Sequence, residues 1–448
     1  QRKEKIEIFI VTQKKYKMRK IIYSLMFLLI VVDISAQQTP AKKQTEPISI
    51  EGATAHLGNG EIIENSLIMF SKGKIIFVGS SKTKIARIGK IIYANGKHIY
   101  PGFIATNSTL GLVEVDAVKA SSDVRETGIM NPHIRSIIAY NAESKVVESM
   151  RPNGVLMAQI TPRGGTISGT SSVVQLDAWN WEDASLKNDD AIHMNWPSSF
   201  TSGRWWLGED PALKPDKNYL KKTEEITSFF KSAKQYHKKD NSIKNLPFSS
   251  TKGLFLGTQK LFIHASGQKE ITDAVTMAKN LGINNLVLVN GHEAEKVATL
   301  LVNNNIPVLL ERPHRNPESE DHAYDYTYTI AKTLTDLGIL VGIGMEGQME
   351  RMNTRNLPFY AGTFAAHGLD KEDAVKLITN NAAKILGIDN KVGTLEVGKD
   401  ATLFISEGDA LDMRGNVLTE AFIQGRKISL ESHQTKLWKR YSNKFKSE

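Results

Sequence analysis

Continuous apolar runs alternate with segments of helical spacing in the second half of this 448-residue chain. The apolar runs cover residues 261–264, 286–289, 307–310 and 339–343. Gly282 and Gly338 follow two segments of helical spacing, and glycine is the residue that most often ends a helix. Continuous apolar strands separated by helices predict a parallel sheet that is buried on both faces. Residues 101–390 are long enough for a (β/α)8 TIM barrel, although the pattern alone also allows a doubly wound sheet.

Short strand-like runs occur on both sides of this α/β region. Two apolar runs around a turn at 71–73 predict a β-hairpin. Similar runs return at 401–405 and 421–423, after the predicted barrel. We therefore expect a small composite β-sandwich domain, built from residues 48–100 and 391–430 at the two ends of the mature chain. The barrel would be inserted between these two parts.

Two further regions have an unusual composition. Residues 213–250 are rich in lysine and weakly apolar, with Phe229 and Phe230 at irregular helical spacing, which favours a solvated surface helix or insertion. Five of the six tryptophans lie between Trp179 and Trp206. We expect these tryptophans to pack in the interior, and the alternative is an aromatic surface that stacks on a ligand.

The N-terminal region combines basic, apolar and small residues in a typical order. Lys17, Arg19 and Lys20 precede the apolar residues 21–32, and Ser35-Ala36 follow, as in a secretory signal peptide. Twelve apolar residues span about 18 Å as a helix, which is less than the roughly 30 Å of a bilayer core, so we expect no stable membrane anchor. We interpret residues 1–36 as an upstream extension plus signal peptide. The mature protein would then be secreted to the periplasm or outside the cell.

The net charge of +9 arises mainly in this leader. Residues 1–36 hold eight Lys/Arg and three Asp/Glu, so the rest of the chain carries +4, which argues against nucleic acid as a partner. Residues 37–47 are predicted to be a linker, and residues 431–448 a basic tail. The chain has no cysteine, which excludes disulfides, thiolate nucleophiles and cysteine-ligated zinc.

Four segments carry motifs that occur in the order of one known family. They are residues 67–79 (the hairpin), 96–104 (Gly-Lys-His-Ile-Tyr-Pro-Gly-Phe-Ile), 368–387 and 393–401 (Gly-Thr-Leu-Glu-Val-Gly-Lys-Asp-Ala). Together they resemble the imidazolonepropionase-like group of the amidohydrolase superfamily. The resemblance implies a (β/α)8 barrel with a composite β domain. It also implies a hydrolase of non-peptide C–N bonds in small cyclic amides or acyl-amino-acid and dipeptide-like compounds.

The chain departs from this family at the metal-ligand positions of two strands. The resemblance places two histidines at alternate positions at the end of the first barrel strand, where both side chains point to one face. This chain has Asn107 and Thr109 at those positions, and Asn290 at the position of the sixth-strand histidine. Amide and hydroxyl groups are neutral and weak zinc ligands. We therefore interpret these three residues as substrate-binding groups and not as metal ligands.

Two remnants of the family's site remain. His264 matches the fifth-strand histidine, and the last-strand aspartate falls on Met345 or Glu346. A catalytic zinc usually has three protein ligands, so we expect no metal unless other residues complete the site. His264 and Glu346 then become candidate acid–base groups, and any dependence on zinc stays conditional.

An acidic loop follows the third apolar run and would face the same barrel mouth. On a barrel, Glu311, Arg312 and His314 would approach the mouth as acid–base groups, and Asp321 would contact the substrate. The competing interpretation is an acidic loop that only contacts solvent, because Pro313 and the charge density favour a loop in any case.

The sequence leaves two classes of function open. One is a C–N hydrolase that acts on a small molecule, and the other is a catalytically silent barrel that binds a small ligand or serves as a partner subunit of a related, active amidohydrolase, in a homo- or hetero-oligomer. A third possibility came from the G-x-G-x-x-G sequence at 342–347, which is typical of dinucleotide-binding folds. We reject it because this sequence closes the alternating region and does not open it.

Overall fold

The computed structural model describes residues 16–20, 39–238, 244–318, 321–347 and 349–446. The chain divides into two compact units, Gln1–Thr39 and Pro40–Glu448. In the first unit residues 16–20 are helical, and the predicted apolar core and cleavage site of the signal peptide lie outside the described residues. Within the described ranges, no helix is both long enough and apolar enough to cross a bilayer.

The second unit contains a nearly closed eight-stranded sheet among its described residues, in the order β17-β16-β15-β14-β11-β10-β9-β8. Its strands are β8 (Phe103–Ser108), β9 (Val155–Ile160), β10 (Ile167–Gln175), β11 (Ser185–Asn195), β14 (Lys260–Ala265), β15 (Leu286–Asn290), β16 (Val308–Leu310) and β17 (Val341–Ile343). The first and last strands meet where the Met345 backbone N–H donates to the Thr106 carbonyl at 2.9 Å. The barrel prediction is confirmed, and the doubly wound alternative is wrong.

One strand breaks the regular strand–helix alternation of a (β/α)8 barrel. β10 runs antiparallel to both β9 and β11, whereas the other neighbouring pairs are parallel. Only the short α3 (Trp181–Ala184) lies between β10 and β11, so the chain turns back within the sheet. Antiparallel neighbours need no crossover helix, which is why residues 155–195 lack the periodicity of the later strands.

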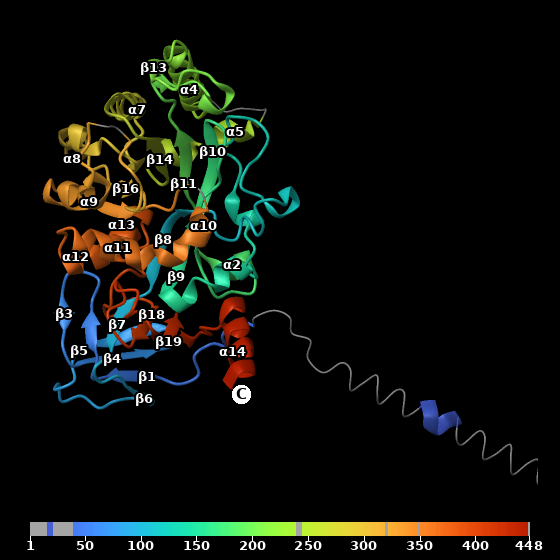
Figure 1. Cartoon of the computed structure of the whole chain (residues 1–448), viewed down its shortest axis with the longest axis vertical. Coiled ribbons are helices and arrows are strands. Elements are labelled where there is room, and N and C mark those ends of the chain that lie inside the picture. The colour runs from blue at the N-terminus through green and yellow to red at the C-terminus, as the bar shows by residue number, and fades with distance from the viewer. Residues whose placement is uncertain (1–15, 21–38, 239–243, 319–320, 348, 447–448) are drawn as a thin grey trace, which may run out of the picture. The chain divides into compact units, whose positions relative to one another are not determined.

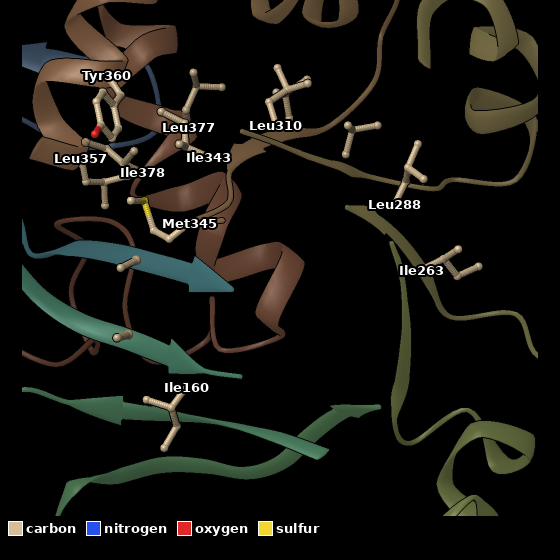
Figure 2. Close-up of a cluster of buried hydrophobic side chains, with 14 of the residues drawn as sticks. Ile160, Ile263, Leu288, Leu310, Ile343, Met345, Leu357, Tyr360, Leu377 and Ile378 are labelled. Carbon is tan, nitrogen blue, oxygen red and sulfur yellow. The ribbon is translucent and has the colours of Figure 1, made fainter. Parts of the chain in front are cut away.

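Helices cover the barrel on its outer side and at one end. The predicted helices of the second half are present as α7 (Gln268–Asn280), α8 (Ala298–Asn303) and α9 (Tyr326–Asp336), and the segment 368–387 forms two helices, α12 (Lys371–Leu377) and α13 (Asn380–Leu386). The helix α11 (Leu357–Ala366) was not predicted. Figure 1 shows α11, α12 and α13 between the barrel strands and the β domain. Figure 2 shows Ile263, Leu288 and Leu310 from the strands in the same buried cluster as residues of these helices.

The barrel interior has two layers of side chains, an apolar layer and, nearer the carboxyl ends of the strands, a polar layer. Ile104, Met157 and Phe262 form an apolar cluster with residues of α13. Two positions further along the same strands lie Thr106, Gln159 and His264, which are buried and polar. Residues i and i+2 of a strand point to the same face, so the interior changes from apolar to polar towards the carboxyl ends of the strands. A functional site is therefore positioned at that end.

The lysine-rich region is a helix with a buried face. α4 (Tyr219–Tyr236) confirms the predicted helix, but Ile226 and Phe230 are buried, so the helix packs on the core as well as facing solvent. The tryptophan prediction holds for Trp196, which is buried, and is wrong for others. Trp205 is 71% exposed, because it lies in the 3-10 turn η4 (Trp205–Leu207) between the short strands β12 (Phe200–Thr201) and β13 (Lys214–Pro215).

Two sheets form the composite β domain. One has the order β5-β4-β1-β6 and the other β20-β19-β18-β7-β2-β3. The strands are β1 (Ile48–Glu51), β2 (Thr54–His56), β3 (Ile62–Ile63), β4 (Ser66–Ser71), β5 (Lys74–Ser80), β6 (Lys90–Tyr93), β7 (His98–Pro101), β18 (Leu403–Ser406), β19 (Leu418–Ile423) and β20 (Arg426–Lys427). β18 pairs with β7, so segments from both ends of the second unit share one sheet, as predicted.

The predicted hairpin is the pair β4–β5. Lys72 and Gly73 both have positive φ, of 50° and 80°, as a type I′ turn requires. Ile68 and Phe70 from this hairpin pack against Phe422 of the other sheet in one core cluster. The predicted basic tail contains the helix α14 (His433–Lys446).

Candidate active site

A cavity of about 1090 Å³ opens at the carboxyl ends of β14 and β15. Its lining includes His264 and Glu346, the two predicted remnants, together with Asn290. Asn290 ends β15 with a φ of +78°, a conformation that asparagine adopts more readily than most residues. Its side-chain Oδ1 is buried and has no hydrogen-bond partner among the residues that the structure describes. Asn290 therefore holds a hydrogen-bond acceptor that the described protein leaves unsatisfied next to the cavity.

Glu346, and not Met345, faces the cavity. Met345 is buried in the hydrophobic cluster drawn in Figure 2. Glu346 Oε2 lies 3.3 Å from His264 Nδ1 and accepts a hydrogen bond of 3.1 Å from Asn107 Nδ2. The structure therefore brings together one residue from each of β8, β14 and the segment after β17.

Arg163, which follows β9 in a glycine-rich segment, supplies a positive charge at this mouth. Its Nη1 donates to Asn107 Oδ1 at 2.9 Å, and its Nη2 donates to the carbonyls of Asn107 and Met345 at 2.7 and 3.0 Å. The guanidinium also lies 3.9 Å from a carboxylate oxygen of Glu350, in α10 (Glu350–Asn353). One Arg side chain thus joins the first barrel strand to the segment after the last.

These contacts keep Glu346 ionised. Burial alone would raise the pKa of its carboxyl, but the nearby His264, the Arg163 charge and the Asn107 hydrogen bond lower it from 4.5 to about 2. A carboxylate with so low a pKa is a weak general base at neutral pH. It is better suited to binding a cationic or N–H donor group.

Thr109, the second predicted position on the first strand, has a different partner. Its backbone N–H donates to Glu350 Oε1 at 2.8 Å, and its hydroxyl also donates to that oxygen. Burial raises the pKa of Glu350, and the positive charge of Arg163 partly offsets this effect. Thr109 is therefore a structural partner of Glu350 and does not line the cavity among the described residues.

A series of buried side-chain hydrogen bonds runs from His264 through His193 and Ser171 to Asp190. His264 Nε2 lies 3.0 Å from His193 Nδ1, and His193 Nε2 lies 2.9 Å from Ser171 Oγ. Ser171 in turn donates to Asp190 at 2.8 Å. Burial raises the pKa of Asp190 and lowers that of His193 well below its ordinary value, so both favour their neutral forms. This series of hydrogen bonds fixes the orientation of the His264 ring.

The acidic loop contributes less to the mouth than the sequence predicts. His314 lies 3.0 Å from the Thr363 hydroxyl, packs against Tyr360, and is not among the cavity-lining residues that the structure describes. Arg312 and Asp321 likewise lie outside the described lining. The loop after β16 instead brings Glu318 and His322 to the described lining, while His314 packs towards α9 and α11.

Glu311 approaches the mouth only through a histidine that was not predicted as a site residue. Glu311 lies 3.6 Å from His292 Nε2, and Glu318 pairs with His292 Nδ1. Burial lowers the pKa of His292, but the two carboxylates raise it above its ordinary value. His292 and Glu318 line the cavity beside Asn290. They form a second charged group at its rim.

The residues present do not fit the divalent metal that the fold family implies. Asn107, Thr109 and Asn290 are neutral, and two of them have hydrogen-bond partners on Arg163 or Glu350. A guanidinium directly at the Asn107 amide repels any cation placed there. Across the ranges that the structure describes, no group of three or more His, Asp or Glu side chains is arranged to hold a metal ion.

Sequence reasoning missed Arg163 and His193. Arg163 precedes two glycines, and its position three residues after β9 is the one signal that could have identified it. His193 lies two residues before the end of β11, a strand that no apolar periodicity indicated. The first half of that strand reads Ser-Leu-Lys-Asn-Asp-Asp, which resembles a loop.

Comparisons with known proteins agree with this architecture. Residues 248–430 match the amidohydrolase family. An amidohydrolase from Thermotoga maritima MSB8 is 23% identical with a TM-score of 0.72, covering 85% of this chain and 99% of that one. Molinate hydrolase is 13% identical with a TM-score of 0.52, covering 86% of this chain and 95% of that one.

A third similar structure is an adenosine deaminase from Xanthomonas campestris with bound zinc. It is 13% identical with a TM-score of 0.52, covering 90% of this chain and 99% of that one. The comparison with curated proteins gave no match. At these identities the structural likenesses establish the fold alone, and the family match covers the later barrel strands and the returning β segment. The chain therefore carries an amidohydrolase family domain at residues 248–430, within a barrel and β domain like those of solved amidohydrolases.

Proposed function

We propose that the barrel mouth binds a small organic ligand and does not carry out metal-dependent hydrolysis. The observation that carries this proposal is the Arg163 guanidinium, which is hydrogen-bonded to Asn107 at the position of a family metal ligand. A fixed cation then compensates the charges of Glu346 and Glu350. At the two ligand positions of the first strand, a metal ion would meet an amide and a hydroxyl, both weak zinc ligands, beside a fixed cation.

The cavity favours a ligand with N–H donors. Asn290 Oδ1 is buried without a partner in the described chain, and Glu346 is an ionised acceptor beside it in the cavity lining. Trp196 and Phe200 add apolar surface to the lining. A small amide or amine would place its N–H groups on these acceptors and its carbon skeleton on the aromatic side chains.

The second candidate is metal-independent hydrolysis of a C–N bond in a cyclic amide, an acyl-amino acid or a dipeptide-like compound. The 3.3 Å contact between His264 Nδ1 and Glu346 at the mouth favours it, because a carboxylate on one ring nitrogen makes the other a better base. In this reaction His264 Nε2 exchanges its 3.0 Å contact with His193 for one with the attacking water. The low pKa of Glu346 means that His264 would be the base and Glu346 the group that positions it.

One set of measurements distinguishes the two candidates. Cyclic amides, N-acyl amino acids and dipeptides are tested for binding by thermal shift and for turnover at high protein concentration, with and without chelator. The proposal expects binding that Asn290→Ala weakens about tenfold, the effect of losing one to two good hydrogen bonds, and no turnover. Turnover that resists chelator and is lost in His264→Gln supports the second candidate. Chelator-sensitive turnover overturns both.

We also propose that the mature chain is exported. As a catalytically silent barrel it would serve as a partner subunit of a related, active amidohydrolase. The basic, apolar and small-residue order of residues 17–36 supports export. N-terminal sequencing of the protein recovered from the periplasm or medium tests it, with cleavage near Ala36 expected. Recovery in the cytoplasm with the leader intact contradicts it.

A further inference from the structure

The C-terminal helix α14 (His433–Lys446) buries none of its side chains within the described protein. Leu437, Trp438, Tyr441 and Phe445 are 37%, 66%, 54% and 67% exposed. Leu437, Tyr441 and Phe445 are spaced by four residues and Trp438 lies three before Tyr441, so all four share one side of the helix. An exposed stripe with three aromatic side chains indicates a surface that is covered in use.

Positive charges lie directly beside this aromatic stripe. Lys436, Arg440 and Lys444 each precede one residue of the stripe, and Lys439 and Lys446 extend the cationic side. No acidic residue occurs between His433 and Lys446. The guanidinium of Arg440 lies 5.7 Å from the Tyr441 ring, so cationic and aromatic groups are adjacent in space as well as in sequence.

The N-terminal end of α14 is hydrogen-bonded to the rest of the second unit, and the residues after it face solvent. Glu148 accepts a hydrogen bond of 2.7 Å from the His433 backbone N–H, and Ser432 is buried. Beyond this anchor the side chains of the helix are mostly exposed. Figure 1 shows α14 at the edge of the β-domain end of the second unit.

We propose that α14 binds reversibly to an anionic lipid surface, a role beyond the ligand site at the barrel mouth. An aromatic stripe flanked by lysine and arginine is the pattern of helices that lie in the headgroup region of a bilayer. Trp and Tyr favour that region because each combines an apolar ring with a polar group. Lys439 pairs with Glu431, just before the helix, and the other four cations of α14 have no acidic residue on the helix itself. This excess of positive charge favours a polyanionic surface over a protein groove, in which unmatched charges are costly to bury.

The absence of cysteine allows a site-specific test on the full chain. Phe445→Cys is labelled with the environment-sensitive fluorophore NBD and mixed with vesicles of phosphatidylglycerol and phosphatidylcholine, or of phosphatidylcholine alone. The control carries the label at Met413→Cys, because Met413 is 72% exposed but lies outside α14. Since the label reports only its own surroundings, contact by another part of the chain leaves its emission unchanged.

We expect a blue-shifted, brighter emission for the Phe445→Cys label with anionic vesicles only, and no change for the Met413→Cys label. Adding Lys439→Glu and Arg440→Glu should weaken the vesicle response at least tenfold, because about four units of charge are reversed next to the lipid. An unchanged label on anionic vesicles overturns the proposal. So does a blue shift without lipid that grows with protein concentration, which would mean that α14 docks on a second copy.

Discussion

Arg163 brings a fixed positive charge to a mouth that holds two buried carboxylates, Glu346 and Glu350. The same guanidinium donates to the carbonyls of Asn107 and Met345, from opposite ends of the barrel sheet. A side chain with five fixed donors can join these groups where a lysine could not. At the residue scale, the mouth is therefore an organised ion-pair network.

Replacing Arg163 tests this network directly. Arg163→Met should lower the free energy of unfolding by about 3 kcal/mol, because it leaves buried carboxylates without their cation. Urea denaturation at neutral pH measures the change. Arg204→Met is the matched control, since Arg204 forms an exposed ion pair with Glu209 and its loss should leave stability nearly unchanged. Equal stability of the two variants contradicts the network.

The pKa of Glu346 gives a pH-dependent prediction. A carboxyl whose pKa falls from 4.5 to about 2 on folding stabilises the native state above pH 4.5, and this contribution is lost as the pH falls towards 2. Glu346→Gln should therefore cost about 3 kcal/mol at pH 7 and about 1 kcal/mol less at pH 4. Urea denaturation of both proteins at the two pH values tests it, and a cost independent of pH would show that Glu346 is not held ionised by its neighbours.

The family resemblance placed His264, Asn290 and Glu346 at the carboxyl ends of barrel strands, and these three residues line one cavity. His314 and Asp321 are not part of the described lining, because the path of a long loop depends on tertiary contacts such as that of His314 with Thr363. The motifs behind the resemblance gave no role to Arg163, whose long side chain reaches the mouth from the segment after β9.

At the scale of elements, polar strands were the hardest to predict. β14 and β15 are continuous apolar runs and were found within one residue of their observed ends. β10 and β11 are buried as well, but they contain Ser171, Asp190 and His193. These side chains satisfy one another by hydrogen bonds inside the barrel, so burial does not require an apolar sequence there.

The lysine-rich helix α4 gives a prediction at this scale. Phe230 is fully buried, so Phe230→Ala should cost about 3–5 kcal/mol of unfolding free energy. Leu220→Ala on the same helix is the control, because Leu220 is 70% exposed and should change stability little. Denaturant titration of both variants measures the difference. A small effect of Phe230→Ala would mean that α4 is a detachable insertion.

The whole second unit depends on both of its ends. β18, near the C-terminus, lies between β19 and β7 in the six-stranded sheet, and Leu403 and Phe422 join Ile50 in the domain core. This interrupted arrangement was predictable, since strand-like runs recur on both sides of the barrel. The position of α14 was not, because an exposed helix has no buried neighbours from which its packing can be inferred.

Truncation tests this dependence. Ending the chain after Asp400 removes β18, β19 and β20 and exposes the apolar faces of β7 and β1. We expect loss of cooperative thermal unfolding and a fall in soluble yield, measured by circular dichroism and by sedimentation. Ending the chain after Ser432, which removes only α14, should keep the melting temperature within a few degrees. Cooperative melting of the shorter protein contradicts the composite domain.

The most direct measurement is zinc stoichiometry after dialysis against excess zinc, read by elemental analysis for the native chain and a restored variant. The variant carries Asn107→His, Thr109→His and Asn290→His, with Arg163→Gln to remove the competing cation. The account predicts substoichiometric zinc on the native chain and a clear gain in the variant. One tightly bound zinc ion per native chain would contradict it, because the neutral residues and the Arg163 guanidinium would then not have replaced the metal.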